Sequence, residues 1–152
     1  MAETITLDAN ILFYAIDVRD PGRQLQAEEV IKHASASGAI LVAITFGEFF
    51  ASAARKLGLS RSVVHQHLMD FSLLFQTASY DLDDVVRAAR ESEAGRFQFW
   101  DAVMLSAAER AGCTVCLSED MADGATLGGI TVRTPFGASG LSATARTALG
   151  IP

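Results

Sequence analysis

The chain has 152 residues, of which 50% are hydrophobic and 20% are charged. This balance is typical of one folded domain and excludes general disorder or a fibrous repeat. The formal net charge is −6, so the chain as a whole lacks the basic character with which many proteins hold nucleic acid by charge alone. The least charged stretch, residues 39–54, contains Glu48 and is shorter than the roughly 20 apolar residues of a membrane span.

No basic region precedes an apolar run in residues 1–4, so we expect no signal peptide, no membrane association and a cytoplasmic location. Short apolar runs then alternate with segments in which apolar residues recur every three or four positions. The predicted strands are residues 4–7, 39–43, 113–117 and 129–133; the predicted helices are residues 10–15, 24–35, 45–57, 60–75, one starting at Asp81 or Asp84, and 99–111. This alternation predicts an α/β fold with a parallel sheet flanked by helices.

Three further segments have simple structural interpretations. Residues 20–22 (Asp-Pro-Gly) predict a turn. Cys113 and Cys116 are expected to be buried small hydrophobic residues on opposite faces of a strand, because a four-thiolate zinc site needs two more cysteines. The Gly-, Ser-, Ala- and Thr-rich residues 137–152 predict a loose or weakly helical tail.

Carboxylates stand where the predicted strands end or the predicted helices begin. Asp8 follows the first strand and Asp120 the third, Glu48 and Asp101 stand early in helices, and Asp123 comes one turn after Asp120. Ligands of parallel sheets bind outside the carboxyl ends of the strands. We therefore expect these acids to meet at one rim of the sheet.

Each acid taken singly also has a structural interpretation. Asp8 and Asp101 suit the N-termini of helices, Thr45 and Glu48 match a capping box, and Asp120 suits a turn. These alternatives remain open for each residue alone. The pattern as a whole favours a site.

A cluster of carboxylates needs cations. Two unit charges 4 Å apart repel by about 4 kcal/mol at an effective dielectric constant near 20, and the only lysines are Lys32 and Lys56. Oxygen ligands suit Mg²⁺ or Mn²⁺, and two such ions can hold the attacking and leaving oxygens of a phosphodiester. The acids therefore predict a divalent metal site for phosphodiester chemistry.

Other acid-based chemistries fit the sequence less well. A phosphoaspartyl phosphatase or receiver domain would pair the acid after the first strand with a late lysine, and none follows Lys56. Asn10 also stands where the second acid of an Asp-x-Asp motif would be. The glycines of residues 124–129 lack the Gly-Lys-Ser/Thr ending of a phosphate-binding loop.

Four segments, in order, resemble the PIN-domain nucleases, in particular the VapC-like toxin ribonucleases of bacterial type II toxin–antitoxin pairs. They are residues 7–15 (LDANILFYA), Glu48 early in a helix, residues 99–102 (FWDA) and residues 117–124 (LSEDMADG), with residues 129–136 (GITVRTPF) similar to the end of that family. The resemblance implies a three-layer α/β/α sandwich with a central, mostly parallel sheet. It also implies a PIN-like nuclease domain over residues 1–136, followed by the tail of residues 137–152.

The same resemblance implies the site and its chemistry. Asp8, Glu48, Asp101 and Asp120 would be the catalytic, Mg²⁺- or Mn²⁺-binding acids, and Asp123 an auxiliary metal acid. Asn10 and Ser118 would orient carboxylates or water. Metal-activated water would attack RNA and leave a 5′-phosphate and a 3′-hydroxyl.

The partners that the resemblance implies are an RNA substrate, a second copy in a homodimer, and an antitoxin whose segment packs along an apolar groove and blocks the acidic site. Arginines such as Arg19, Arg55, Arg96 or Arg133 could steer the RNA. The alternative from another functional class is a catalytically silent PIN-fold binding module.

Overall fold

The computed structural model describes residues 3–152; Met1 and Ala2, which open the predicted domain, lie outside the described residues. The elements in chain order are β1 (Ile5–Leu7), α1 (Ala9–Ala15), α2 (Pro21–Ala36), β2 (Ile40–Val42), α3 (Ala43–Lys56), α4 (Arg61–Ser72), β3 (Gln76–Ala78), α5 (Leu82–Glu93), α6 (Phe99–Arg110), β4 (Val115–Leu117), β5 (Thr126–Leu127), β6 (Ile130–Arg133) and α7 (Ala143–Leu149).

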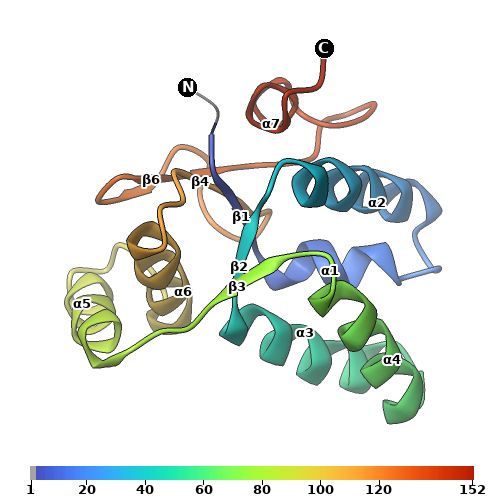
Figure 1. Cartoon of the computed structure of the whole chain (residues 1–152), viewed down its shortest axis with the longest axis horizontal. Helices are drawn as coiled ribbons and strands as arrows, with labels where there is room; N and C mark the ends of the chain where they lie inside the picture. Colours follow the sequence, from blue (N-terminus) through green and yellow to red (C-terminus); the bar gives the residue numbers. More distant parts are fainter. Residues whose placement is uncertain (1–2) are drawn as a thin grey trace.

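The strands form a mostly parallel sheet. β1, β4, β6 and β5 are neighbours in that order; β1 pairs in parallel with β4, and β4 with β6, whereas β5 runs antiparallel to β6. β2 and β3 pair in parallel as a second sheet, and β2 contacts β1. Helices α5 and α6 lie on one side of β1, and α1 to α4 lie on the other (Figure 1). The predicted three-layer α/β/α architecture is confirmed.

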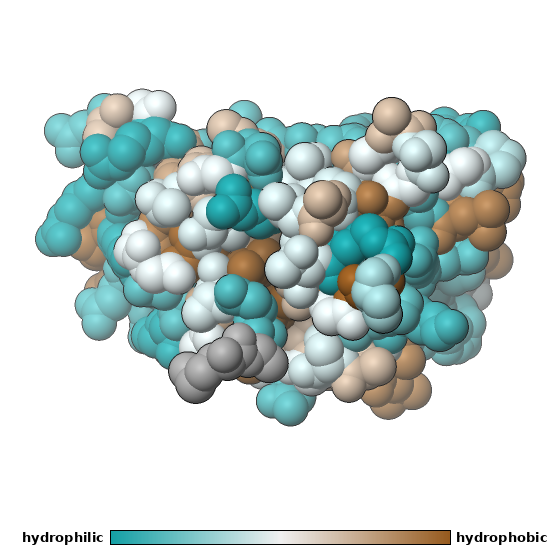
Figure 2. Space-filling view, turned by 90° about the horizontal axis from the view of Figure 1, so that it is seen from above, coloured by the Kyte–Doolittle hydropathy of each residue, from teal (hydrophilic) through white to brown (hydrophobic). Residues whose placement is uncertain are grey.

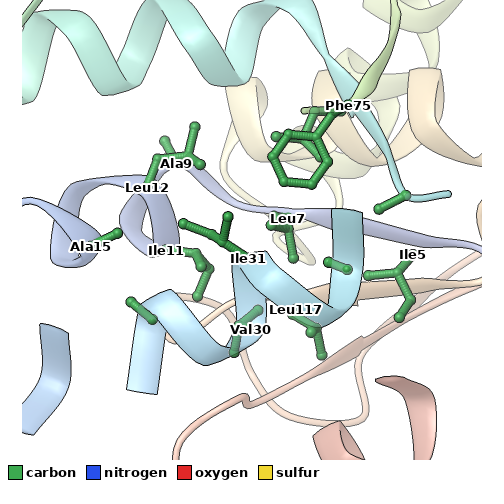
Figure 3. Close-up of a cluster of buried hydrophobic side chains, with 14 of the residues drawn as sticks. Ile5, Leu7, Ala9, Ile11, Leu12, Ala15, Val30, Ile31, Phe75 and Leu117 are labelled. Carbon is green, nitrogen blue, oxygen red and sulfur yellow. The ribbon is translucent and has the colours of Figure 1, made fainter. Parts of the chain in front are cut away.

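Two apolar clusters fill the space between the layers. Ile5 and Leu7 of β1 and Leu117 of β4 pack with α1 and α2 on one side (Figure 3). Cys116 and Val132 pack with α6 on the other side. Because successive side chains of a strand point to opposite faces, the three-residue strands β1 and β4 serve both layers and are fully covered.

Both cysteines are buried free thiols, as predicted. They nevertheless belong to the same apolar cluster rather than to opposite faces. β4 begins only at Val115, and Cys113 follows Gly112, whose φ of 100° turns the chain after α6. Cys113 is therefore outside the strand and free of its alternation.

Two predicted helix starts were wrong. Asp20, expected in a turn, is the N-cap of α2: its Oδ1 accepts a hydrogen bond from the Arg23 N–H at 3.1 Å, and Pro21 is the first helical residue, where its missing N–H costs no hydrogen bond. α3 begins at Ala43, directly after β2, and has no side-chain cap. Thr45 and Glu48 consequently do not form a capping box.

The segment after residue 136 packs on the domain. Ser142 caps α7 by accepting a hydrogen bond from the Ala145 N–H at 3.1 Å, and Gly150 ends the helix in the left-handed conformation. Ala145 and Leu149 are buried in the cluster that contains β1, and α7 contacts α2. Helix α7 therefore covers apolar surface of the main core.

The face opposite the carboxyl end of β1 is covered mainly by polar and weakly hydrophobic residues, with only small, separate apolar areas (Figures 1 and 2). Within residues 3–152, no helix combines the length and the apolar character needed to cross a membrane.

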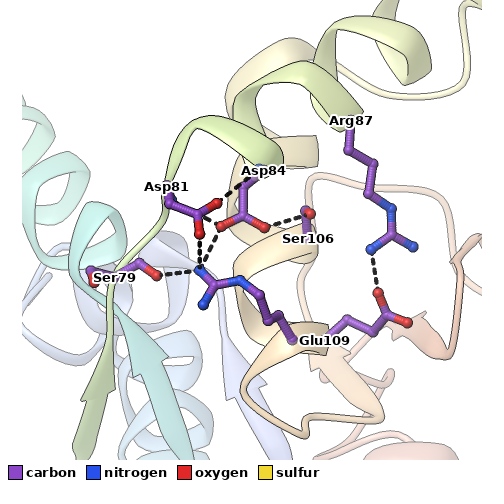
Figure 4. Close-up of polar contacts among 7 residues, drawn as sticks. Ser79, Asp81, Asp84, Arg87, Ser106 and Glu109 are labelled. Atoms are coloured by element: carbon purple, nitrogen blue, oxygen red, sulfur yellow. Dashed lines mark hydrogen bonds and ion pairs between the residues drawn. The ribbon is translucent and has the colours of Figure 1, made fainter.

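Asp84 ties α5 to α6 through a buried polar network (Figure 4). Its carboxylate, only 2% exposed, accepts hydrogen bonds from Ser106 Oγ (2.8 Å), Arg110 Nη2 (2.7 Å) and the Asp81 N–H (3.0 Å). Burial by itself would raise the pKa of Asp84, but the bonds from Arg110, Asp81 and Ser106 outweigh it and hold the pKa below its usual value. The ionised form therefore stabilises the packing of α5 on α6.

We predict that Asp84→Ala lowers the free energy of unfolding by about 2 kcal/mol, because it leaves Ser106 and the helix N-terminus without their acceptor. Since the folded pKa is depressed, the contribution of Asp84 is present above its unfolded pKa and is lost as the pH falls through the folded value. Urea unfolding at neutral pH measures the loss. Asp83→Ala, an exposed acid in the same helical turn, is the control, and equal losses in the two variants would contradict the network's role.

Candidate active site

A cavity of about 720 Å³ opens at the carboxyl ends of β1 and β4, a volume usual for small-molecule and cofactor sites. Asp8, Glu48, Asp101 and Asp120 all line it. They come from the end of β1, from α3, from the first turn of α6 and from the loop after β4. The fold thus brings together four acids that are widely separated in the sequence.

Asp8 is the most fixed of these acids. It is 5% exposed and caps α1: its Oδ1 accepts a hydrogen bond from the Ala9 N–H at 2.7 Å, and its Oδ2 accepts one from Ser118 Oγ at 2.6 Å. Burial raises the pKa of Asp8, and the nearby charge of Asp120 adds to this, while the bonds from Ser118 and Ala9 oppose it. The capping interpretation of Asp8 is therefore correct, but it leaves a buried carboxylate without a cation.

Ser118 links two of the acids. Its hydroxyl donates to Asp8 and accepts a hydrogen bond from the Asp120 N–H at 3.2 Å. Because Ser118 follows β4 directly and Asp8 follows β1 directly, the pairing of Leu7 with Leu117 sets this contact. The hydroxyl lies where a group that orients both acids is needed.

Glu48 and Asp101 line the same cavity and have strongly shifted pKa values. Loss of hydration raises the pKa of Glu48 to about 7, with further contributions from the charges of Asp8 and Asp101. Loss of hydration likewise raises the pKa of Asp101 to about 6, helped by Asp8 and Asp120. Asp101 stands in the first turn of α6, where a carboxylate is favoured by the helix dipole, although the N-cap is Gln98. Glu48 stands in the second turn of α3 and caps no helix.

The cavity holds few positive charges. Lys56 and Arg96 are the cations among its lining residues, and Arg96 already forms an ion pair with Glu91 at 2.6 Å. Arg19, Arg55 and Arg133 do not line it. Within residues 3–152, four carboxylates therefore line a cavity with one ammonium group that has no ion pair, and this imbalance favours binding of divalent cations.

The donor set fits a hard divalent ion. All the charged donors are carboxylate oxygens, the ligand type that Mg²⁺ and Mn²⁺ prefer. Asn10 adds an amide whose oxygen and nitrogen are buried without a hydrogen-bond partner among residues 3–152. In this described range no three acidic, cysteine or histidine groups are already clustered at ligating distances. No described residue holds the carboxylates of Glu48, Asp101 or Asp120 by a hydrogen bond, so these oxygens are available to an ion.

Glu119 and Asp123 lie outside the group of acids that line the cavity. Asp123 accepts a hydrogen bond from the Thr134 N–H at 3.0 Å. Glu119 accepts hydrogen bonds from Tyr14 Oη at 2.7 Å and Arg23 Nη1 at 2.6 Å. Both acids thereby hold the loop that carries Asp120.

Arg23 is itself held by aromatic rings. Its guanidinium carbon lies 4.2 Å from the centre of the Phe136 ring and 5.6 Å from that of Tyr14, distances suited to cation–π attraction. The start of α2 and the segment after β6 therefore both brace the loop beside the cavity.

Two lining residues, Lys56 and Trp100, were not singled out in the sequence. Glu48, Ser52 and Lys56 follow one another at intervals of four in α3 and share one helical face, so this spacing could have indicated Lys56. Trp100 directly precedes Asp101, and its large aromatic ring at the start of an otherwise buried helix was the available signal.

The sequence model of the PIN domain family matches residues 5–121. Among curated proteins, none is significantly similar to this chain in sequence. The family match contains all four acids that line the cavity.

Solved structures share the fold. VapC20 from Mycobacterium tuberculosis, described as a sarcin-ricin loop cleaving toxin, is 14% identical with a TM-score of 0.59, over 77% of this chain and 90% of that chain. VapBC2 from Rickettsia felis, described as bound to a DNA fragment from its promoter, is 13% identical with a TM-score of 0.54, over 77% of this chain and 88% of that chain. At these identities the similarity establishes the fold.

We predict that the metal-free protein loses stability as the pH rises through neutrality. The folded pKa of Glu48, about 7, lies above the ordinary value of 4.5, so its favourable contribution is complete below 4.5 and is lost as the pH rises through about 7. Asp101 acts in the same direction around pH 6. Glu48→Gln, which cannot ionise, should therefore gain stability relative to wild type between about pH 5 and about pH 8.

Urea unfolding in the presence of a chelator, at the two ends of this pH range, measures the effect. Glu93→Gln, an exposed glutamate at the end of α5, is the matched control and should follow the wild type. If Glu48→Gln and Glu93→Gln respond alike to pH, Glu48 does not carry the shifted charge.

Proposed function

The chain belongs to the PIN domain family, and we propose that it is a metal-dependent endoribonuclease, the toxin of a type II toxin–antitoxin pair. The observation that carries this proposal is the meeting of Asp8, Glu48, Asp101 and Asp120 in one cavity. The pKa values of the first three of these acids are raised. VapC20, which shares the fold, is described as a toxin that cleaves the sarcin-ricin loop. Its description supports RNA as the substrate.

The proposed cofactor is Mg²⁺ or Mn²⁺. Asp8, already oriented by Ser118 and Ala9, would hold it together with Asp101, Asp120 and Glu48, and Asp123 would assist by holding the loop of Asp120. When bound, the cation supplies Lewis-acid stabilisation of the negative charge that develops on the scissile phosphate. Asn10 and Ser118 would orient carboxylates or water beside it.

Glu48 is suited to accept the proton of the attacking water. A carboxylate beside the bound cation can take up this proton, and Glu48 lines the cavity together with Asp8 and Asp101. The water oxygen would bond to phosphorus as the bond from phosphorus to the 3′ oxygen breaks. The leaving oxygen takes a proton to give a 3′-hydroxyl, and the other product carries a 5′-phosphate.

A second hollow suits the proposed antitoxin. It has a volume of about 330 Å³ and lies between α1, α2, α3 and α4, with Ile16, Leu57 and Val63 among its apolar lining. Leu57 directly follows Lys56, which lines the acidic cavity, so a segment in this groove could continue into the site. The VapBC2 neighbour, described as bound to a promoter DNA fragment, supports a partner of this kind.

The proposed homodimer would use apolar surface on α5. Leu82 and Val86 are 74% and 43% exposed and stand four residues apart on one helical face. Burying such side chains against a second copy would remove them from water. The proposed location of the complex is the cytoplasm.

The alternative is a catalytically silent PIN-fold binding module. A module that binds without cleaving has no need for four uncompensated carboxylates in one cavity, since their mutual repulsion opposes folding. The presence of all four favours the nuclease.

We predict that the wild-type protein cuts a mixed cellular RNA pool at discrete positions with Mg²⁺ or Mn²⁺ and not with a chelator. Asp8→Asn and Asp101→Asn should lower the rate by at least about 10²-fold, since each removes an anionic ligand of the proposed cation. Asp123→Asn should cause a smaller loss. Asp83→Asn, outside the cavity, is the control. Cleavage that survives in both Asp8→Asn and Asp101→Asn would overturn the nuclease assignment.

We predict that a neighbouring gene product with a DNA-binding N-terminus and a basic C-terminal segment inhibits this cleavage. Val63→Lys, which places a charge in the apolar groove, should weaken inhibition without changing the cleavage rate of the free protein. Lys32→Ala, on α2 outside the groove, is the control. Unchanged inhibition of Val63→Lys would exclude this groove as the antitoxin site.

A further inference from the structure

Trp100 presents an unusual amount of aromatic surface to the acidic cavity. It is the only tryptophan of the chain, lines the cavity and is 50% exposed, although the residues that follow in α6, from Ala102 to Ala108, are buried. Burying a large aromatic side chain is normally strongly favourable. A ligand that covers the half-exposed indole next to Asp101 would therefore gain binding free energy.

The ring is held in a defined orientation. Phe99 packs against it at 4.9 Å between ring centres with an interplanar angle of 75°, and Tyr80 at 6.2 Å with an angle of 69°. Both contacts are edge-to-face, and no aromatic ring within residues 3–152 stacks on Trp100 face to face. These edge-to-face contacts position the indole, and no described aromatic ring stacks on its flat faces.

Because carboxylates line the cavity, a contact with RNA that does not depend on charge would strengthen binding. Phosphates approach Asp8, Glu48 and two further carboxylates, while Lys56 is the cavity's one cation without an ion pair among the described residues. Apart from the proposed cation, the cavity therefore offers phosphates less positive charge than basic nucleic-acid sites do. Base stacking on an aromatic ring does not depend on charge and tolerates any sequence, because every base has a π face.

We propose that Trp100 stacks on an unpaired base next to the scissile phosphate and is a substrate-positioning residue of the cavity. The proposal rests on the nuclease function proposed above and names a residue that positions the substrate at the same site. A base inside a duplex already stacks on its neighbours, so only an unpaired or extruded base can use the indole. Lys56, two turns along α3 from Glu48, would bind a phosphate farther along the same strand.

Because Trp100 is the only tryptophan, its fluorescence reports the contact directly. Asp8→Asn protein in Mg²⁺, which should not cut RNA, would be titrated with a short mixed-sequence single-stranded RNA and with the same RNA annealed to its complement. We expect saturable quenching by the single strand and little by the duplex. Equal quenching by both, or none, overturns the proposal, and so does a signal that follows protein dilution instead of RNA, which would indicate a subunit contact.

Cleavage kinetics provide the second test. Trp100→Ala should raise KM about tenfold, the effect of losing one stacked base, with a smaller change in kcat, and Trp100→Phe should recover most of the loss. Met69→Ala, an apolar residue of similar exposure remote from the cavity, should match wild type, and circular dichroism should show all variants folded. A wild-type KM in Trp100→Ala overturns the stacking role and leaves the nuclease function intact. If the wild type cuts no RNA, the nuclease proposal fails, and the fluorescence titration still decides whether Trp100 stacks.

Discussion

The parallel pairing of β1 with β4 is the constraint on which the site depends. With Leu7 opposite Leu117, the first polar residues beyond the two strands, Asp8 and Ser118, meet at 2.6 Å. Each strand has only three residues, all buried, so a slip of one residue would move side chains to the opposite layer and separate this pair. Hydrophobic burial thus fixes a polar contact at the rim of the cavity.

Two buried aspartates have opposite pKa shifts because their electrostatic surroundings differ. Asp84 lies beside Arg110, and its pKa is lowered despite burial. Asp8 has comparable burial and two hydrogen bonds but no cation, and its pKa is raised. The same residue type is therefore a stabilising anchor between α5 and α6 and an uncompensated charge at the cavity. Only the second arrangement leaves a charge that a metal ion would compensate, and this supports the role proposed for the carboxylates of the cavity.

The features predicted correctly from the sequence are those that a local residue pattern determines. Buried strands and amphipathic helices appeared as apolar runs and periodicities, and the acids at their ends appeared as a group, because parallel strands end at one rim of the sheet. β3 was missed because its three residues are largely exposed and carry no apolar signal, and β5 because it is a two-residue strand in a glycine-rich turn. The start of α3 was misplaced because tertiary packing, not a capping side chain, begins that helix. Lys56 and Trp100 become neighbours of the acids only when the fold brings α3 and α6 to one cavity, so their place in the site could not be predicted from local patterns.

The C-terminal segment is best understood through its connection to the Asp120 loop. Phe136 stacks on Arg23, Arg23 binds Glu119, and Glu119 is the neighbour of Asp120. α7 in turn packs on α2, whose first turn contains Arg23. Residues beyond the region that the family model matches are thus connected, through Arg23 and Glu119, to the loop that carries Asp120. The segment expected as a tail therefore contributes buried residues to the main core beside α2, and through α2 it is connected to the loop of Asp120.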